Sequence, residues 1–109
     1  MISESVYQLG LKHNINPFDL MWTSRYVFDK NAAKASIVWE HTTPLNEFYQ
    51  TLVKCKSQAE VELELTNYSG VCWITREEDN LLNKNKFRSN RPGGWAKCYS
   101  DCQIKIVKR

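Results

Sequence analysis

Long apolar runs, glycine, proline and internal repeats are all scarce in this 109-residue chain. No stretch approaches the roughly 20 apolar residues that a membrane-spanning helix needs. Four glycines and three prolines exclude the collagen-like and low-complexity classes. No Ser/Gly-rich linker divides the chain, and either half would be too small to bury its own core, so we expect one domain over residues 1–109.

Cysteine and histidine are scarce as well. Four cysteines are too few for a disulfide scaffold, and the N-terminal Met1–Ser5 has neither the basic nor the apolar segment of a secretory signal. We therefore expect reduced thiols and a cytoplasmic location. The chain has two histidines, His13 and His41, so a mechanism that needs an imidazole has two candidates. His13 lies beside Lys12 at the end of a predicted helix, where a capping or surface role is typical.

Charge is segregated along the chain. Residues 84–109 hold eight of the 15 lysines and arginines and one of the 12 acidic residues, which makes this segment +7 and the remainder −4. A dense cluster of cations is typical of a surface that binds a polyanion such as nucleic acid, because phosphate contacts supply most sequence-independent affinity. The alternative is a solvated basic tail.

Hydrophobic periodicity predicts a helix-rich α+β fold with a small sheet of two or three strands. The segments rich in β-branched and aromatic residues predict strands at 36–41 and 71–75, and polar-apolar alternation predicts an edge strand at 103–108. Helical spacing and capping-box patterns predict helices at 3–12, 44–53, 57–67, 76–83 and 95–102, with 18–35 mostly helical.

The predicted loop after residue 83 interleaves cations with aromatic side chains. This pattern suits phosphate contacts combined with base stacking. The alternative for its aromatic residues is that they anchor the loop to the core. The candidate nucleic-acid-binding residues are Lys84, Lys86, Arg88, Arg91 and Trp95.

Trp39-Glu40-His41-Thr42-Thr43-Pro44 resembles the acid-His-x-x-Pro signature that opens the catalytic hairpin of HNH-type nucleases. The segment Val71–Leu81 is similar to the second strand and the helix of that unit. The resemblance implies a ββα unit that grips one divalent metal ion, Mg²⁺, with the predicted helices between the two strands as an insertion. The small size of the chain favours a protein of the kind that phages and mobile elements encode.

The resemblance also implies roles for individual residues. It assigns Glu40 as a metal ligand, His41 as the general base that deprotonates the attacking water, and Asp79 or Asn80 as the ligand on the helix. Two alternatives stay open. His41 is a structural histidine in a nucleic-acid-binding module, or the chain is a non-catalytic phage-encoded inhibitor or binding protein that acts on a host nucleic-acid enzyme.

Overall fold

The computed structural model of the chain describes residues 1–24, 26–29, 35–67 and 70–108. Within these residues one mixed sheet has the strand order β2-β3-β1-β4. β2 and β3 pair antiparallel with Trp39 opposite Trp73, whereas β1 runs parallel to β3 and antiparallel to β4. The strands are β1 (Ile2–Ser3), β2 (Ile37–His41), β3 (Val71–Thr75) and β4 (Ile106–Val107).

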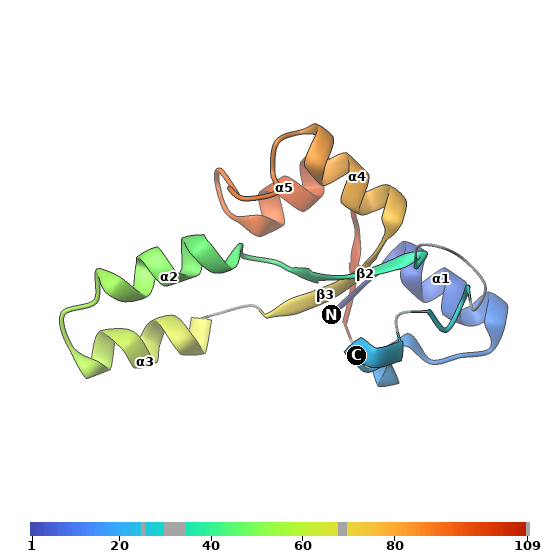
Figure 1. Cartoon of the computed structure of the whole chain (residues 1–109), viewed down its shortest axis with the longest axis horizontal. Coiled ribbons are helices and arrows are strands. Elements are labelled where there is room, and N and C mark those ends of the chain that lie inside the picture. The colour runs from blue at the N-terminus through green and yellow to red at the C-terminus, as the bar shows by residue number, and fades with distance from the viewer. Residues whose placement is uncertain (25, 30–34, 68–69, 109) are drawn as a thin grey trace.

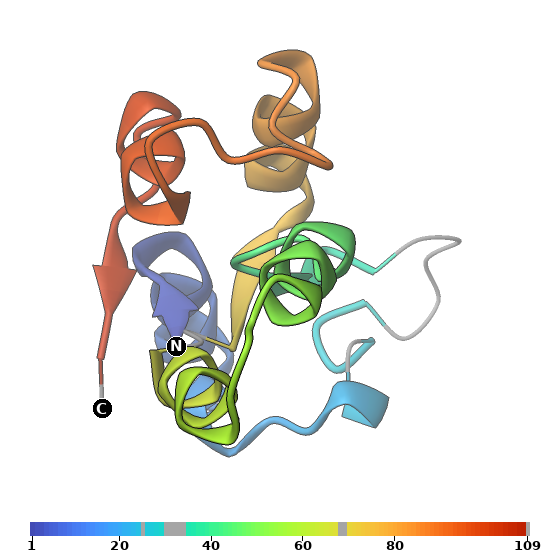
Figure 2. The same ribbon diagram turned by 90° about the vertical axis from the view of Figure 1, so that its left-hand side faces the viewer.

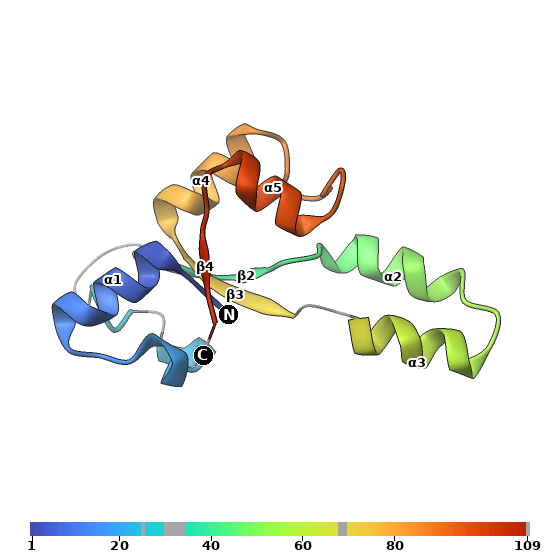
Figure 3. The same ribbon diagram turned by 180° about the vertical axis from the view of Figure 1, so that it is seen from behind.

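The helices lie on both faces of the sheet and beyond one end of it. α4 and α5 lie side by side on one face, and α1 packs on the other (Figures 1 and 2). α2 and α3 form a hairpin that extends away from the ends of β2 and β3, which gives the molecule its long axis of 47 Å (Figures 1 and 3). The helices are α1 (Glu4–His13), α2 (Leu45–Val53), α3 (Gln58–Asn67), α4 (Arg76–Lys84) and α5 (Trp95–Asp101).

The core consists of two clusters because successive side chains along a strand point to opposite faces of the sheet. On one face Cys72 and Ile74 of β3 pack against Leu82 of α4 and Tyr99 of α5. On the other face Trp73 packs with residues of β1, α1 and β2. Helices therefore pack against both faces of the sheet, and residues 72–75 of the central strand β3 are buried.

The helices and the mixed sheet confirm the predicted α+β fold. β2 pairs with β3, and α4 follows β3 directly. The sheet has four strands and not two or three. The added strand is β1, whose two residues are too few for an alternating pattern to predict it. The edge strand predicted at 103–108 is present as β4, which is shorter than predicted. In the described part of the chain no helix has the length and apolar character needed to cross a bilayer.

The prediction that residues 18–35 are mostly helical is wrong for the described part of that segment. It contains two short 3₁₀ turns, Pro17–Asp19 and Trp22–Ser24, and residues 25 and 30–34 lie outside the described residues. Phe18 reaches the core cluster beside α1 from a 3₁₀ turn and Phe28 from a separate turn, so packing of these side chains does not require one helix face.

A capping box at the start of α4 links that helix to the N-terminal strand. The Thr75 hydroxyl accepts from the Glu78 amide at 3.2 Å, and the Glu78 carboxylate accepts from the Thr75 amide at 2.9 Å. The same carboxylate oxygen accepts from the Ser3 hydroxyl at 2.6 Å, although Ser3 is 75 residues away in sequence. Glu78 is 8 % exposed, so its loss would leave two buried donors without this partner.

We expect Glu78→Ala to lower the free energy of unfolding by about 2 kcal/mol, because both donors would lose their shared acceptor in a buried site. The matched control is Glu77→Ala, whose side chain is exposed one position earlier in the same first turn. Urea denaturation followed by circular dichroism measures both variants. Equal stability of the two variants would contradict the role given to Glu78.

Candidate functional site

A cleft of about 660 Å³ lies along the outer side of β2, which is the edge strand of the sheet. One wall comes from β2 and the segment that follows it, and the other comes from α4 and the loop after α4. The lining residues are Val38, Trp39, Glu40, His41, Pro44, Leu45, Asn46, Asp79, Arg88 and Ser89.

The cleft brings together four of the candidate site residues, although they come from three segments of the chain. Glu40 and His41 end β2, Asp79 lies in the first turn of α4, and Arg88 lies in the loop after α4. The antiparallel pairing of β2 with β3 explains this arrangement, because α4 begins directly where β3 ends and lies against β2 as well as β3.

The other candidate residues lie elsewhere. Asn80 is exposed and does not line the cleft, and Lys84 and Lys86 are exposed at and after the end of α4. Trp95 begins α5 and lines a different cavity. The predicted loop therefore divides into an exposed basic part and a part that packs into the protein.

Arg91 belongs to the packed part and does not fit the predicted role of a nucleic-acid contact. It is 4 % exposed, and its guanidinium forms an ion pair with Glu40 through Nη2. Its Nε donates to the Thr42 carbonyl at 3.1 Å, and Nη2 also donates to the His41 carbonyl at 3.4 Å. Arg91 thus ties the loop to the end of β2.

Glu40 has both carboxylate oxygens engaged. Oε1 accepts from Arg91 and Oε2 accepts from the hydroxyl of Tyr99, which lies on α5. Burial raises the pKa of Glu40 above its ordinary value, and the hydrogen bond from Tyr99 and the charge of Arg91 oppose that rise. Burial and the nearby Glu40 carboxylate raise the pKa of Tyr99, so the phenol stays protonated and donates. Sequence reasoning missed Tyr99, because its spacing within a short helix gives no signal of a partner on β2.

The hydrogen bonds to both carboxylate oxygens of Glu40 affect the metal site that the family resemblance implies. Among the described residues, no group of three His, Cys, Asp or Glu side chains is placed to hold a metal ion. The other carboxylate that lines the cleft belongs to Asp79. Mg²⁺ is commonly held by one or two carboxylates, with waters and substrate phosphates completing its coordination, and Asp79 fits that limited role.

The pleat of β2 separates Glu40 from His41. Glu40 lies on the face covered by α5, as its bond to Tyr99 shows, and the next side chain along a strand points to the opposite face. The His41 side chain therefore points away from the Glu40–Arg91 pair. His41 lines the cleft at the edge of the sheet.

The buried cysteine of β3 is not a candidate nucleophile. Cys72 is fully buried on β3, opposite Glu40, and burial raises the pKa of its thiol to about 12. The thiol is thus protonated at neutral pH and packs as a small apolar side chain.

No family model, no curated protein and no solved structure matches this chain. The functional argument therefore depends on the residues of the cleft and on their geometry.

Proposed function

We propose that the protein binds a nucleic acid in the β2 cleft and hydrolyses its phosphodiester bond, as an HNH-like metal-dependent endonuclease. The observation that carries this proposal is that His41, Asp79 and Arg88, which come from three separate segments, line one cleft of about 660 Å³. That volume falls within the range of small-molecule and cofactor sites.

The three residues have complementary roles in this chemistry. His41 is the general base that takes a proton from the attacking water, a role that histidine fills more often than any other residue. Arg88 supplies positive charge for the phosphate, which its planar guanidinium matches. Asp79 is the carboxylate that would hold Mg²⁺, and a bound divalent ion supplies Lewis-acid polarisation of the scissile phosphate.

Glu40 lines the cleft and supports the site through its hydrogen bonds rather than as a metal ligand. Its pairing with Arg91 and Tyr99 holds the end of β2, the loop after α4 and α5 in one arrangement. Arg88 lies three residues before Arg91 in that loop, so the same cluster holds the loop backbone beside the cleft.

A second candidate function is favoured by the α2–α3 hairpin. Leu45, Tyr49 and Val53 follow one another at four-residue spacing along α2 and are 57 %, 61 % and 54 % exposed. An amphipathic helix with its apolar stripe in water is typical of a protein-binding surface. This observation supports a non-catalytic protein that binds or inhibits a host nucleic-acid enzyme.

Plasmid nicking distinguishes the two candidates. We expect the wild-type protein to nick plasmid DNA in Mg²⁺ or Mn²⁺ and to stop in excess EDTA, and we expect Asp79→Asn to lower the rate at least about 10-fold because the cleft loses its available carboxylate. The matched control is Glu77→Gln, which changes an exposed carboxylate in the same turn. Absence of metal-dependent cleavage of both duplex and single-stranded substrates would contradict the nuclease proposal and support the binding protein.

A further inference from the structure

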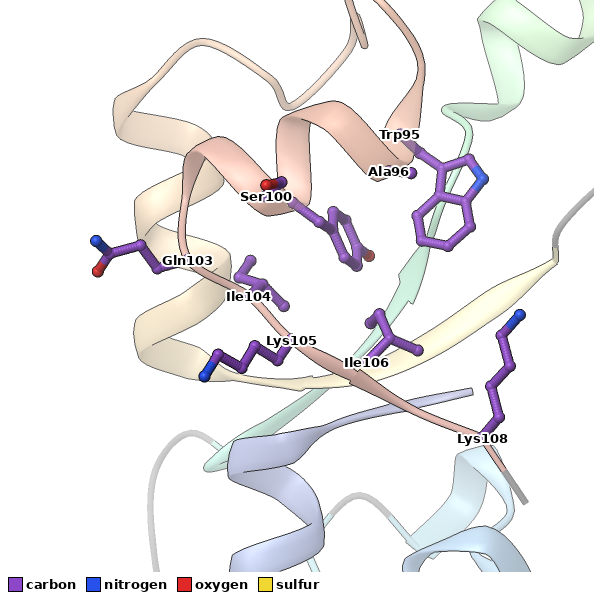
Figure 4. Close-up of a pocket in the computed structure, with 9 residues that line it drawn as sticks. Trp95, Ala96, Ser100, Gln103, Ile104, Lys105, Ile106 and Lys108 are labelled. Carbon is purple, nitrogen blue, oxygen red and sulfur yellow. The ribbon is translucent and has the colours of Figure 1, made fainter.

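A second cavity, of about 730 Å³, lies between α5 and β4, at the opposite edge of the sheet from the β2 cleft (Figure 4). No residue of the β2 cleft lines it. It exists because the side chains of α5 next to β4 are small. Ala96 and Ser100 lie one helical turn apart in the cavity wall and do not fill the space between the helix and the strand.

The floor of this cavity is apolar and its rim is cationic. Ile104 is 4 % exposed in the core below α5, and Ile106 packs against the same core cluster. Side chains two residues apart in an extended segment share a face, so Lys108 belongs to the same side as Ile104 and Ile106. In Figure 4 the Lys108 amine extends towards the end of the cavity where Trp95 lies.

Trp95 supplies an aromatic wall. Its indole is half-buried and packs edge-on against Tyr99, with ring centroids 5.4 Å apart and an interplanar angle of 83°. The edge-on contact with Tyr99 holds the indole in place, and the indole also lines the cavity. The Tyr99 hydroxyl bonds to Glu40, so one side chain connects this cavity to the β2 cleft.

We propose that this cavity is a subsite for an unpaired nucleotide, which stacks its base against Trp95 and places its phosphate beside Lys108. The inference rests on the proposed function, since it assigns single-stranded nucleic acid as the substrate class that reaches both cavities. Base stacking on an exposed aromatic side chain next to a cation is the usual chemistry of single-strand recognition, and it tolerates any base.

The strand at this edge disfavours a peptide as the occupant. A peptide that extended the sheet would pair with β4, which has two residues and is flanked by Lys105 and Lys108. Very short edge strands with flanking lysines are a common protection against added strands. The positive charge favours a polyanion, because residues 84–109 carry eight cations against one carboxylate.

The test is fluorescence anisotropy with a fluorescein-labelled dT12 oligonucleotide, measured in EDTA so that binding is separate from cleavage. A duplex of the same length and an acidic peptide of similar charge are the comparison probes. The variants are Trp95→Leu, Lys108→Ala and Ser100→Phe, the last of which fills the cavity from an exposed position on α5. Lys54→Ala, at the exposed end of α2, is the matched control for lost charge.

We expect dT12 to bind more tightly than the duplex, and Trp95→Leu and Ser100→Phe each to weaken dT12 binding by about 5- to 100-fold. Lys108→Ala should make the log Kobs against log salt slope less negative by about 0.7, while Lys54→Ala stays within about twofold of the wild type. Thermal unfolding confirms that each variant is folded, and Ser100→Phe tests the cavity independently if Trp95→Leu is unstable.

Three results would overturn the inference: no binding of dT12, dT12 affinities of Trp95→Leu and Ser100→Phe within twofold of the wild type, or binding of the acidic peptide without binding of dT12. Failure of the nuclease proposal has a different signature. The wild type would then bind dT12 in a manner that depends on Trp95 and Ser100, yet cleave nothing in Mg²⁺.

Discussion

Replacing Arg91 with methionine is expected to lower the free energy of unfolding by about 3–5 kcal/mol, which is typical of removing one partner from a buried ion pair. The Arg91 and Glu40 side chains are 2 % and 11 % exposed, so the carboxylate left behind would stay in a nearly dry site with Tyr99 as its remaining donor. The Thr42 carbonyl would lose the hydrogen bond from Arg91 too. For a chain of this size the melting temperature should fall by more than about 10 °C.

Arg88→Met is the matched control, because Arg88 is exposed in the same loop and its replacement should change stability by no more than about 0.5 kcal/mol. The double variant Glu40→Leu with Arg91→Met should recover most of the loss, since two apolar side chains leave no buried charge. A cost below about 1 kcal/mol for Arg91→Met would contradict the structural role of the pair.

The stability gap between Arg91→Met and the wild type should also depend on pH. Burial already raises the pKa of Glu40 in the folded protein, so the contribution of this residue to stability is fully present below its ordinary pKa of 4.5 and is lost as pH rises through the folded value. Without Arg91 the pKa of Glu40 in the folded protein lies higher still, so the variant continues to lose stability at higher pH. The gap should be small near pH 4 and widen towards pH 7, and a constant gap would contradict this assignment.

The second large effect concerns catalysis, where His41→Ala is expected to lower the nicking rate by about 10²- to 10⁴-fold, the usual contribution of a positioned general base. His41 lines the cleft at the end of β2, and its backbone carbonyl accepts from Arg91, so the position of the residue is held by a buried group. Initial rates of plasmid nicking in Mg²⁺ measure the effect. The salt dependence of DNA binding should change little, because an alanine here removes no phosphate-binding cation.

The protein contains its own control for this variant. His13, the other histidine of the sequence, ends α1. Its ring packs against the ring of Phe28, with the two ring centroids 5.2 Å apart. Phe28 packs against the core cluster beside α1. His13→Ala should retain the full nicking rate. A rate for His41→Ala within twofold of the wild type would assign the base to another residue, and equal losses in both variants would point to a general effect of histidine removal on stability.

The fold could be predicted from sequence wherever the signal is local. The apolar run at 71–75 is β3, and the Thr75–Glu78 spacing correctly marks the start of α4. Prediction failed where tertiary contacts replace local preference. β1 has two residues, and its pairing with β3 and β4 stabilises it through partners more than 70 residues away.

The candidate site also combines features that local sequence patterns predict with features that tertiary contacts decide. The resemblance to HNH-type nucleases singled out His41 and Asp79, the basic loop pattern singled out Arg88, and these three line one cleft. The sequence pattern equally marked Glu40, Arg91 and Trp95, but it carries no information about which side of a strand or loop is covered. The face of β2 on which Glu40 lies is set by the sheet register and by α5.

The sequence by itself determined the helices and strands that have periodic or capping signals, the basic character of residues 84–109 and the residue types available for chemistry. The tertiary structure alone decided that Glu40 pairs with Arg91, 51 residues later, and with Tyr99, and that a cavity opens beside Trp95. The physical reason is that local patterns depend on neighbouring residues, whereas the partner of a buried charge depends on the path of the whole backbone.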